Sequence, residues 1–245
     1  ETALAHLKEC HGEGLRTLMD MAPFDLGRDV RLLEEVSQKS GVRIIASTGT
    51  WLTPPREFAT STPDMIAPLY VRETQEGIEG TGIKAGIIKA ATDRGGVTDV
   101  GEILLRAVAR AHHQTGVPIS THTYSPGRVG EEQVRVFKEE GVNLNRVCIG
   151  HSNDTTDMDY LTGLLEQGVW LGLDHFPGGS ADTPDWEART QVVKQLIERG
   201  YGDRLMLSHD FNLRQHRANQ EERKARWERN PDGYLFIKRR VLPRL

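Results

Sequence analysis

Residues with metal-binding chemistry stand at the ends of several short apolar runs in this chain. They are Lys89, His122, His151, Asp174-His175 and Asp210. Imidazole and carboxylate groups are the ligands that zinc, manganese, iron and cobalt prefer in proteins. The chain has no H-E-x-x-H motif, so we expect a dispersed site with one or two ligands from each segment. One such residue alone is typical of packing or helix capping, but the whole series favours a metal site.

Lys89 interrupts an apolar run over residues 86–91 that is typical of a buried strand. A lysine in an apolar strand is costly unless its charge is compensated. Its side chain could reach solvent at the strand end, as long cationic side chains often do. It could instead pair with an acidic group or carry a chemical modification, and the segment alone leaves all three open.

Apolar runs alternate with amphipathic segments along the whole chain. The runs are centred on Leu18, Ile44, Ile87, Ile119, Cys148, Leu171 and Leu205. Helices are predicted between them, most clearly over residues 100–112, where apolar residues recur with a helical period. Further helices are predicted over residues 3–13, 190–199 and 234–245. Each step between runs leaves room for one strand and one helix.

This alternation predicts an α/β fold, with a parallel sheet covered by helices. A (β/α)8 TIM barrel is the leading architecture, because its functional residues gather at the carboxyl ends of the strands. A doubly wound open sheet is the alternative, but no glycine-rich nucleotide-binding motif follows the first run. Seven strands are predicted, one fewer than a barrel needs. We expect a single domain over residues 1–245 whose first barrel strand is absent from this sequence.

Composition limits the classes of function. The 245 residues are 37% hydrophobic and 27% charged, with a net charge of -4, which argues against a nucleic-acid partner. No apolar run approaches the roughly 20 residues of a membrane-spanning helix. Two cysteines, Cys10 and Cys148, provide no disulfide framework and suit a reducing compartment. With no visible leader, these features predict a cytoplasmic protein.

Five ordered motifs carry a resemblance to a known family. They are GIIKAAT at residues 86–92, THT at 121–123, IGHSND at 149–154, GLDH at 172–175 and SHD at 208–210. Together they resemble the phosphotriesterase family of the amidohydrolase superfamily. The likeness extends from FDLGRD at residues 24–29 to NPDG at 230–233, nearly the whole chain.

The resemblance implies a centre of two divalent metal ions, zinc first, with cobalt or manganese as alternatives. Lys89 would be carboxylated by CO2 to N6-carboxylysine and would bridge both ions. His122 and His151 would bind one ion. Asp210 would bind the other and accept the proton of a metal-bridging hydroxide, which attacks the substrate.

The resemblance also assigns roles to residues that lie around the metals. His175 and Asp154 would relay the proton from Asp210 to solvent, and His175 would also contact substrate. Trp51 would line the leaving-group pocket. The family's first strand carries a His-x-His pair that does not occur here, so we expect a family member truncated at both ends.

The implied activity is zinc-dependent hydrolysis of a phosphotriester or related small-molecule ester. The alternative is a lactonase, acting on acyl-homoserine or other lactones with promiscuous phosphotriesterase activity. The motifs are mixed: Trp51 and His175 favour the first reading, and SHD at residues 208–210 favours the second. A non-catalytic barrel is a third hypothesis, supported only by the missing histidine pair. The resemblance further implies a homodimer.

Overall fold

A computed structural model describes residues 2–179, 182–211 and 220–245. Its centre is one parallel sheet of seven strands, in the order β1-β2-β3-β4-β5-β6-β7. The strands are β1 (Thr17–Asp20), β2 (Arg43–Gly49), β3 (Ile87–Ala91), β4 (Ile119–His122), β5 (Val147–Ile149), β6 (Trp170–Leu173) and β7 (Leu205–Leu207). Because each strand pairs with the next one along the chain, every connection crosses over outside the sheet.

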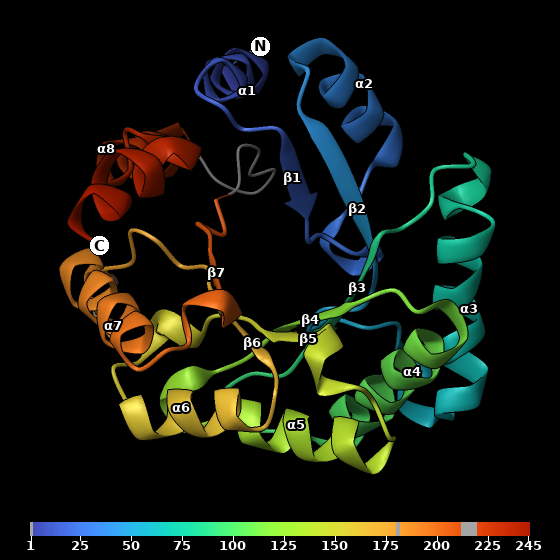
Figure 1. Cartoon of the computed structure of the whole chain (residues 1–245). Coiled ribbons are helices and arrows are strands. Elements are labelled where there is room, and N and C mark those ends of the chain that lie inside the picture. The colour runs from blue at the N-terminus through green and yellow to red at the C-terminus, as the bar shows by residue number, and fades with distance from the viewer. Residues whose placement is uncertain (1, 180–181, 212–219) are drawn as a thin grey trace.

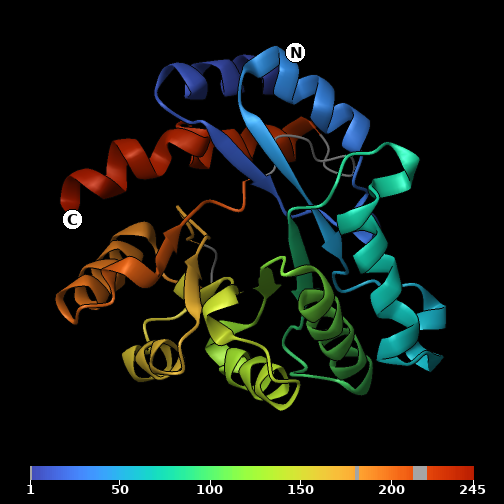
Figure 2. The ribbon, with the colours of Figure 1, turned by 45° about the vertical axis from the view of Figure 1, so that its right-hand side comes forward.

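The helices cover the outer side of this sheet. They are α1 (Thr2–Gly12), α2 (Val30–Ser40), α3 (Pro63–Gln75), α4 (Asp99–Thr115), α5 (Val129–Glu139), α6 (Met158–Glu166), α7 (Trp186–Glu198) and α8 (Gln220–Arg229). Figures 1 and 2 show the strands curled into an arc around a central space, with the helices outside it. In the described ranges, no helix is long and apolar enough to cross a membrane.

Local sequence accounts for the main elements. All five residues of β3 are buried, as expected for a strand in a sheet covered by helices. Helix α4 begins after Thr98, whose hydroxyl accepts a hydrogen bond from the amide of Gly101 at 3.1 Å. It ends at Gly116, which takes the left-handed conformation common at helix ends. Between these caps its apolar face is buried in the main core.

The predicted partial barrel is confirmed. Each predicted apolar run contains one observed strand, and the seven strands lie in chain order as a (β/α)8 barrel requires. Among the described residues, β1 pairs only with β2 and β7 only with β6, so the arc is open between them. The helix predicted from residue 190 begins earlier, at Trp186, because Asp185 caps it by accepting the amide of Ala188 at 2.8 Å.

The end of the chain is helical, as predicted, but not a regular α-helix. Over the expected residues 234–245 it forms one π-helical turn (Ile237–Val241) between two short 3-10 turns (Gly233–Leu235 and Leu242–Arg244). Arg239 forms ion pairs with Glu9 of α1 and with Asp232. These long-range contacts hold the last turns against α1. The local periodicity of the sequence cannot predict such contacts.

Candidate active site

The parallel strands bring the predicted site residues to one edge of the sheet. Lys89 lies within β3, and His122 is the last residue of β4. The register pairs Lys89 with Ser120 and Ala91 with His122, so β4 carries its histidine beyond the lysine. His151, His175 and Asp210 follow β5, β6 and β7. Carboxyl ends of parallel strands meet at one edge, which explains how residues distant in sequence converge here.

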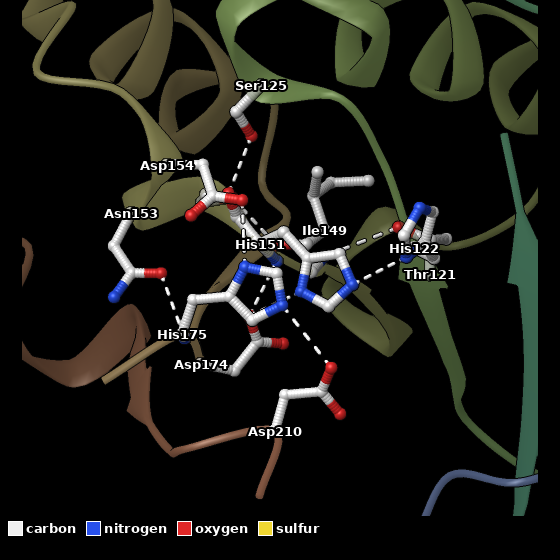
Figure 3. A network of polar contacts seen from close by, with 12 residues as sticks. Thr121, His122, Ser125, Ile149, His151, Asn153, Asp154, Asp174, His175 and Asp210 are labelled. Carbon is white, nitrogen blue, oxygen red and sulfur yellow. Dashed lines mark hydrogen bonds and ion pairs between the residues drawn. The ribbon is translucent and has the colours of Figure 1, made fainter. Parts of the chain in front are cut away.

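His151 is held rigidly by its neighbours. Its backbone is in the left-handed region, with φ 55°, which non-glycine residues rarely adopt and which is found more often at functional sites. The Asp174 carboxylate accepts hydrogen bonds from the backbone amide of His151 at 2.7 Å and from its Nδ1 at 2.9 Å. The Ser125 hydroxyl donates to the carbonyl oxygen of His151 at 2.9 Å (Figure 3). Nε2 is therefore the ring nitrogen left to face the site.

That nitrogen meets a second imidazole. His151 Nε2 lies 2.7 Å from Nδ1 of His122. Burial, with the nearby charges of His151 and Lys89, lowers the pKa of His122 to about 3. The His122 ring is thus neutral at physiological pH and offers a lone pair. Two imidazole nitrogens pointed at one another are the kind of donors that a divalent cation accepts.

His175 connects two carboxylates. Its Nδ1 lies 2.8 Å from Asp154 Oδ2, and its Nε2 lies 3.3 Å from Asp210 Oδ2 (Figure 3). Burial lowers the pKa of His175, but the hydrogen bonds to Asp154 and Asp210 outweigh it and raise the pKa to about 10. Desolvation opposes ionisation of Asp210, yet the hydrogen bond from His175 and nearby cationic groups lower its pKa. These contacts form a continuous path for a proton from Asp210 to Asp154.

Arg189 supports one end of this path. It was not among the site residues predicted from the sequence. Its side chain is 1% exposed, and its Nη2 donates to Asp154 Oδ1 at 2.8 Å. Nη1 donates to the carbonyl of Asn153 at 2.6 Å, and Nε to that of Pro184 at 2.8 Å. The guanidinium fixes the Asp154 carboxylate in place. Nothing local in the sequence marks this arginine, because its partner lies on a different segment.

Lys89 is buried at the base of the site, with 6% of its surface exposed. Burial lowers the pKa of its ammonium, although the charges of Asp210 and Asp174 partly oppose that effect. No described residue forms a hydrogen bond or ion pair with its Nζ. A positive charge buried without a partner is costly. A reaction that removes this charge from the Lys89 amine would therefore be favoured.

Trp51 lies beside the histidines, just after β2. Its ring centroid is 5.9 Å from that of His122, in an edge-on arrangement. The Asp25 carboxylate accepts the backbone amide of Trp51, at 3.0 and 2.9 Å to its two oxygens. Gly49, two residues earlier, allows β2 to approach β3 closely here: a side chain there would place Cβ 2.0 Å from the carbonyl oxygen of Lys89. The Trp51 ring thus lies at the edge of the histidine cluster.

The donor chemistry fits a metal. Among the described residues, ligand atoms of His151, His175 and Asp210 all lie within 4.8 Å of one another. This group overlaps the predicted ligand set but is not identical to it. It includes His175, which was predicted as the relay, whereas His122 contacts the group through His151 and Lys89 lies buried beneath it. Two imidazoles and a carboxylate are a ligand set typical of zinc and related ions.

Comparisons with known proteins agree with this chemistry. The chain is 41% identical over 217 residues to a phosphotriesterase homology protein of Mycobacterium tuberculosis, covering 85% of this chain and 66% of that protein. It is 36% identical over 211 residues to an aryldialkylphosphatase of Saccharolobus solfataricus, covering 85% and 67%. It is 30% identical over 222 residues to an N-acetyltaurine hydrolase of Dictyostelium discoideum, covering 86% and 60%.

These relatives are longer than the chain, which spans about two thirds or less of their length. Two of the three have names that describe hydrolases. The sequence model of the phosphotriesterase family matches residues 1–245. The chain therefore belongs to the phosphotriesterase family.

Proposed function

We propose that this chain forms the site of a metal-dependent hydrolase acting on a small ester. The observation that carries the proposal is the convergence, at one edge of the sheet, of two proposed ligands, His151 and Asp210, with the proposed relay His175: one atom from each lies within 4.8 Å of the others. Here the second nitrogen of each ring points toward other potential ligands.

Lys89, His122, His151 and Asp210 would hold two divalent ions, most suitably zinc. The lysine would first be carboxylated: its neutral Nζ attacks CO2, an N–C bond forms, and one proton is released. This reaction replaces a buried cation by an anion that can bind metal. When bound, the metals would lower the pKa of a water molecule and polarise the P=O or C=O bond under attack.

The protein groups would manage the proton. Asp210 is placed to accept it, since its carboxylate faces His175 Nε2 at 3.3 Å. His175 then passes a proton toward Asp154, whose ionised form Arg189 stabilises through a 2.8 Å ion pair. A carboxylate–imidazole–carboxylate chain is suited to general acid–base work because each group can be restored after one turnover.

Two candidate substrates are the esters that the sequence also favoured, a phosphotriester and a lactone. A phosphotriester agrees with the name of the Saccharolobus relative, an aryldialkylphosphatase. A lactone agrees with the SHD motif. A third candidate, amide hydrolysis, is favoured by a different observation: the similarity to an N-acetyltaurine hydrolase, whose name denotes a substrate with an acyl–nitrogen bond.

A kinetic panel on the zinc- and bicarbonate-loaded protein tests the proposal. Paraoxon, an acyl-homoserine lactone and N-acetyltaurine represent the three bond types. We expect metal-dependent turnover of at least one of them, lost in Asp210→Asn. Turnover that is equal in Asp210→Asn and wild type, or that persists after chelation, would contradict it.

A further inference from the structure

A second part of the site lies beyond the metal-binding groups. A cavity of about 410 Å³ extends from His175 and Asp210 to Arg229 and Asn230, next to the end of α8. Its volume is at the small end of the usual range for ligand sites. Because the reacting groups and Arg229 line the same cavity, one small ligand can contact both.

The charges that line this cavity are balanced except at one place. Arg189 pairs with Asp154, and Asp210 with His175. Arg229 is exposed and, within the part of the chain that the structure describes, forms no ion pair. The rest of the wall includes the aromatic rings of Phe176 and Phe211. Arg229 therefore brings to this cavity a positive charge that no described residue neutralises.

Asn230 follows Arg229 and lines the same cavity. It is 3% exposed, and its Nδ2 donates to the carbonyl of Gly233 at 3.1 Å. This hydrogen bond fixes the turn directly after Arg229.

We propose that Arg229 binds an oxyanion, a carboxylate or a sulfonate, carried by the substrate away from the bond that is hydrolysed. This inference rests on the proposed hydrolase and names its substrate class: small esters or amides with an anionic end. A wholly apolar substrate would remove water from the guanidinium and give no hydrogen bond in return. A carboxylate or sulfonate returns two, because its oxygens match the planar fork of the guanidinium.

A matched pair of esters tests this on the metal-loaded protein. Mono-4-nitrophenyl adipate carries a carboxylate at the end of its acyl chain, and 4-nitrophenyl hexanoate is its neutral counterpart. We measure the ratio of kcat/KM for the anionic ester to that for the neutral ester. Arg229→Gln should lower this ratio about tenfold or more, chiefly through KM, and Arg229→Lys should lower it less.

The control is Arg199→Gln, which removes another exposed arginine that does not line the cavity. Its ratio should equal that of wild type. A ratio in Arg229→Gln within about twofold of wild type would overturn the proposed anion site, while leaving the hydrolase proposal intact if both esters are turned over.

Binding of adipate, measured by calorimetry on the same three variants and wild type, separates the two proposals. Weaker adipate binding in Arg229→Gln than in wild type and Arg199→Gln supports the anion site even if wild type hydrolyses neither ester, because the hydrolase itself is tested by the separate panel of paraoxon, lactone and N-acetyltaurine. Equal adipate binding by wild type and Arg229→Gln would overturn the anion site. A sulfonate of similar length, tested in the same way, shows which oxyanion binds more tightly.

Discussion

Lys89 shows how a single residue can be interpreted once its surroundings are known. From the sequence, its side chain could reach solvent, pair with an acid or carry a modification. At 6% exposure it does not reach solvent, and no described residue hydrogen-bonds its Nζ. Asp210 and Asp174 act on it only through their charges. These surroundings suit the carboxylation of Lys89 proposed above.

We therefore expect a carbamate on Lys89. After loading with zinc and 13C-bicarbonate, wild type should show a carbamate carbon resonance by NMR. Lys89→Ala should lack the resonance, because Lys89 is the one buried lysine in the described part of the chain. Lys84→Ala, which removes an exposed lysine before the same strand, should retain it. A resonance that survives in Lys89→Ala would place the modification elsewhere.

Asp210 gives a second prediction that concerns a single residue. Asp210→Asn preserves the shape of the side chain but removes its capacity to accept a proton. We expect kcat on the best substrate of the panel to fall by about 10²- to 10⁴-fold, the usual contribution of a general acid–base group. Far-UV circular dichroism should remain that of wild type. A kcat like that of wild type would exclude Asp210 from proton transfer.

At the scale of elements, a buried ion pair fixes the segment that leads to Trp51. Arg28, in the turn after β1, donates to both carboxylate oxygens of Glu73 on α3, at 2.9 and 2.7 Å. It also donates to the carbonyl of Ser47 in β2 at 2.8 Å. Thr48 adds a hydrogen bond to the same carboxylate at 2.5 Å. Three segments are thus joined around one guanidinium.

Breaking this pair should be costly. In Arg28→Met the Glu73 carboxylate stays buried without its cation, and the free energy of unfolding should fall by about 3–5 kcal/mol in urea titrations. Lys39→Met, which breaks the exposed pair with Glu35, should cost less than about 1 kcal/mol. The double variant Arg28→Met/Glu73→Met should recover part of the loss. Equal losses for Arg28→Met and Lys39→Met would show that burial does not set the cost.

Contacts between elements also explain which features could be predicted from the sequence. Strands such as β3 are marked by local apolar runs, so they could be predicted, and residues at or after the ends of these runs could be expected at one edge of the sheet; their roles as ligands stay a prediction. Arg189 could not, because its importance depends on a contact with Asp154 across a distant stretch of chain. The π-helical turn at Ile237–Val241 was likewise missed, since its packing on α1 depends on ion pairs rather than on periodicity. A polar, charge-rich stretch runs from Arg214 to Arg229 in the sequence; α8 occupies its later part, and residues 212–219 lie outside the described residues.

For the whole molecule, the proposed metals would connect strands that lie far apart in the arc. Lys89, His122, His151 and Asp210 come from β3, β4 and the segments after β5 and β7. Figure 1 shows how these strands surround the central space. A ligand bound by several strands of the folded chain, and not by the unfolded one, stabilises the whole sheet.

Metal removal should therefore lower the thermal stability of the protein. With free zinc at one hundred times its Kd, binding adds about 2.7 kcal/mol to the free energy of unfolding. We expect the Tm to be several degrees higher with zinc than with a chelator, by differential scanning calorimetry. Magnesium, which prefers a full set of oxygen ligands, should shift the Tm less. Identical Tm values with zinc and with chelator would contradict metal binding by the folded state.

The most direct test of the central claim is the zinc content per chain. It is measured by elemental analysis after loading with zinc and bicarbonate and removal of free metal, for wild type, His151→Asn and His113→Asn. His113 is an exposed histidine on α4 and serves as the control. We predict at least about one zinc per chain in wild type and in His113→Asn, and a large loss in His151→Asn. Wild type without zinc, or equal zinc in wild type and His151→Asn, would contradict a metal centre at this edge of the sheet.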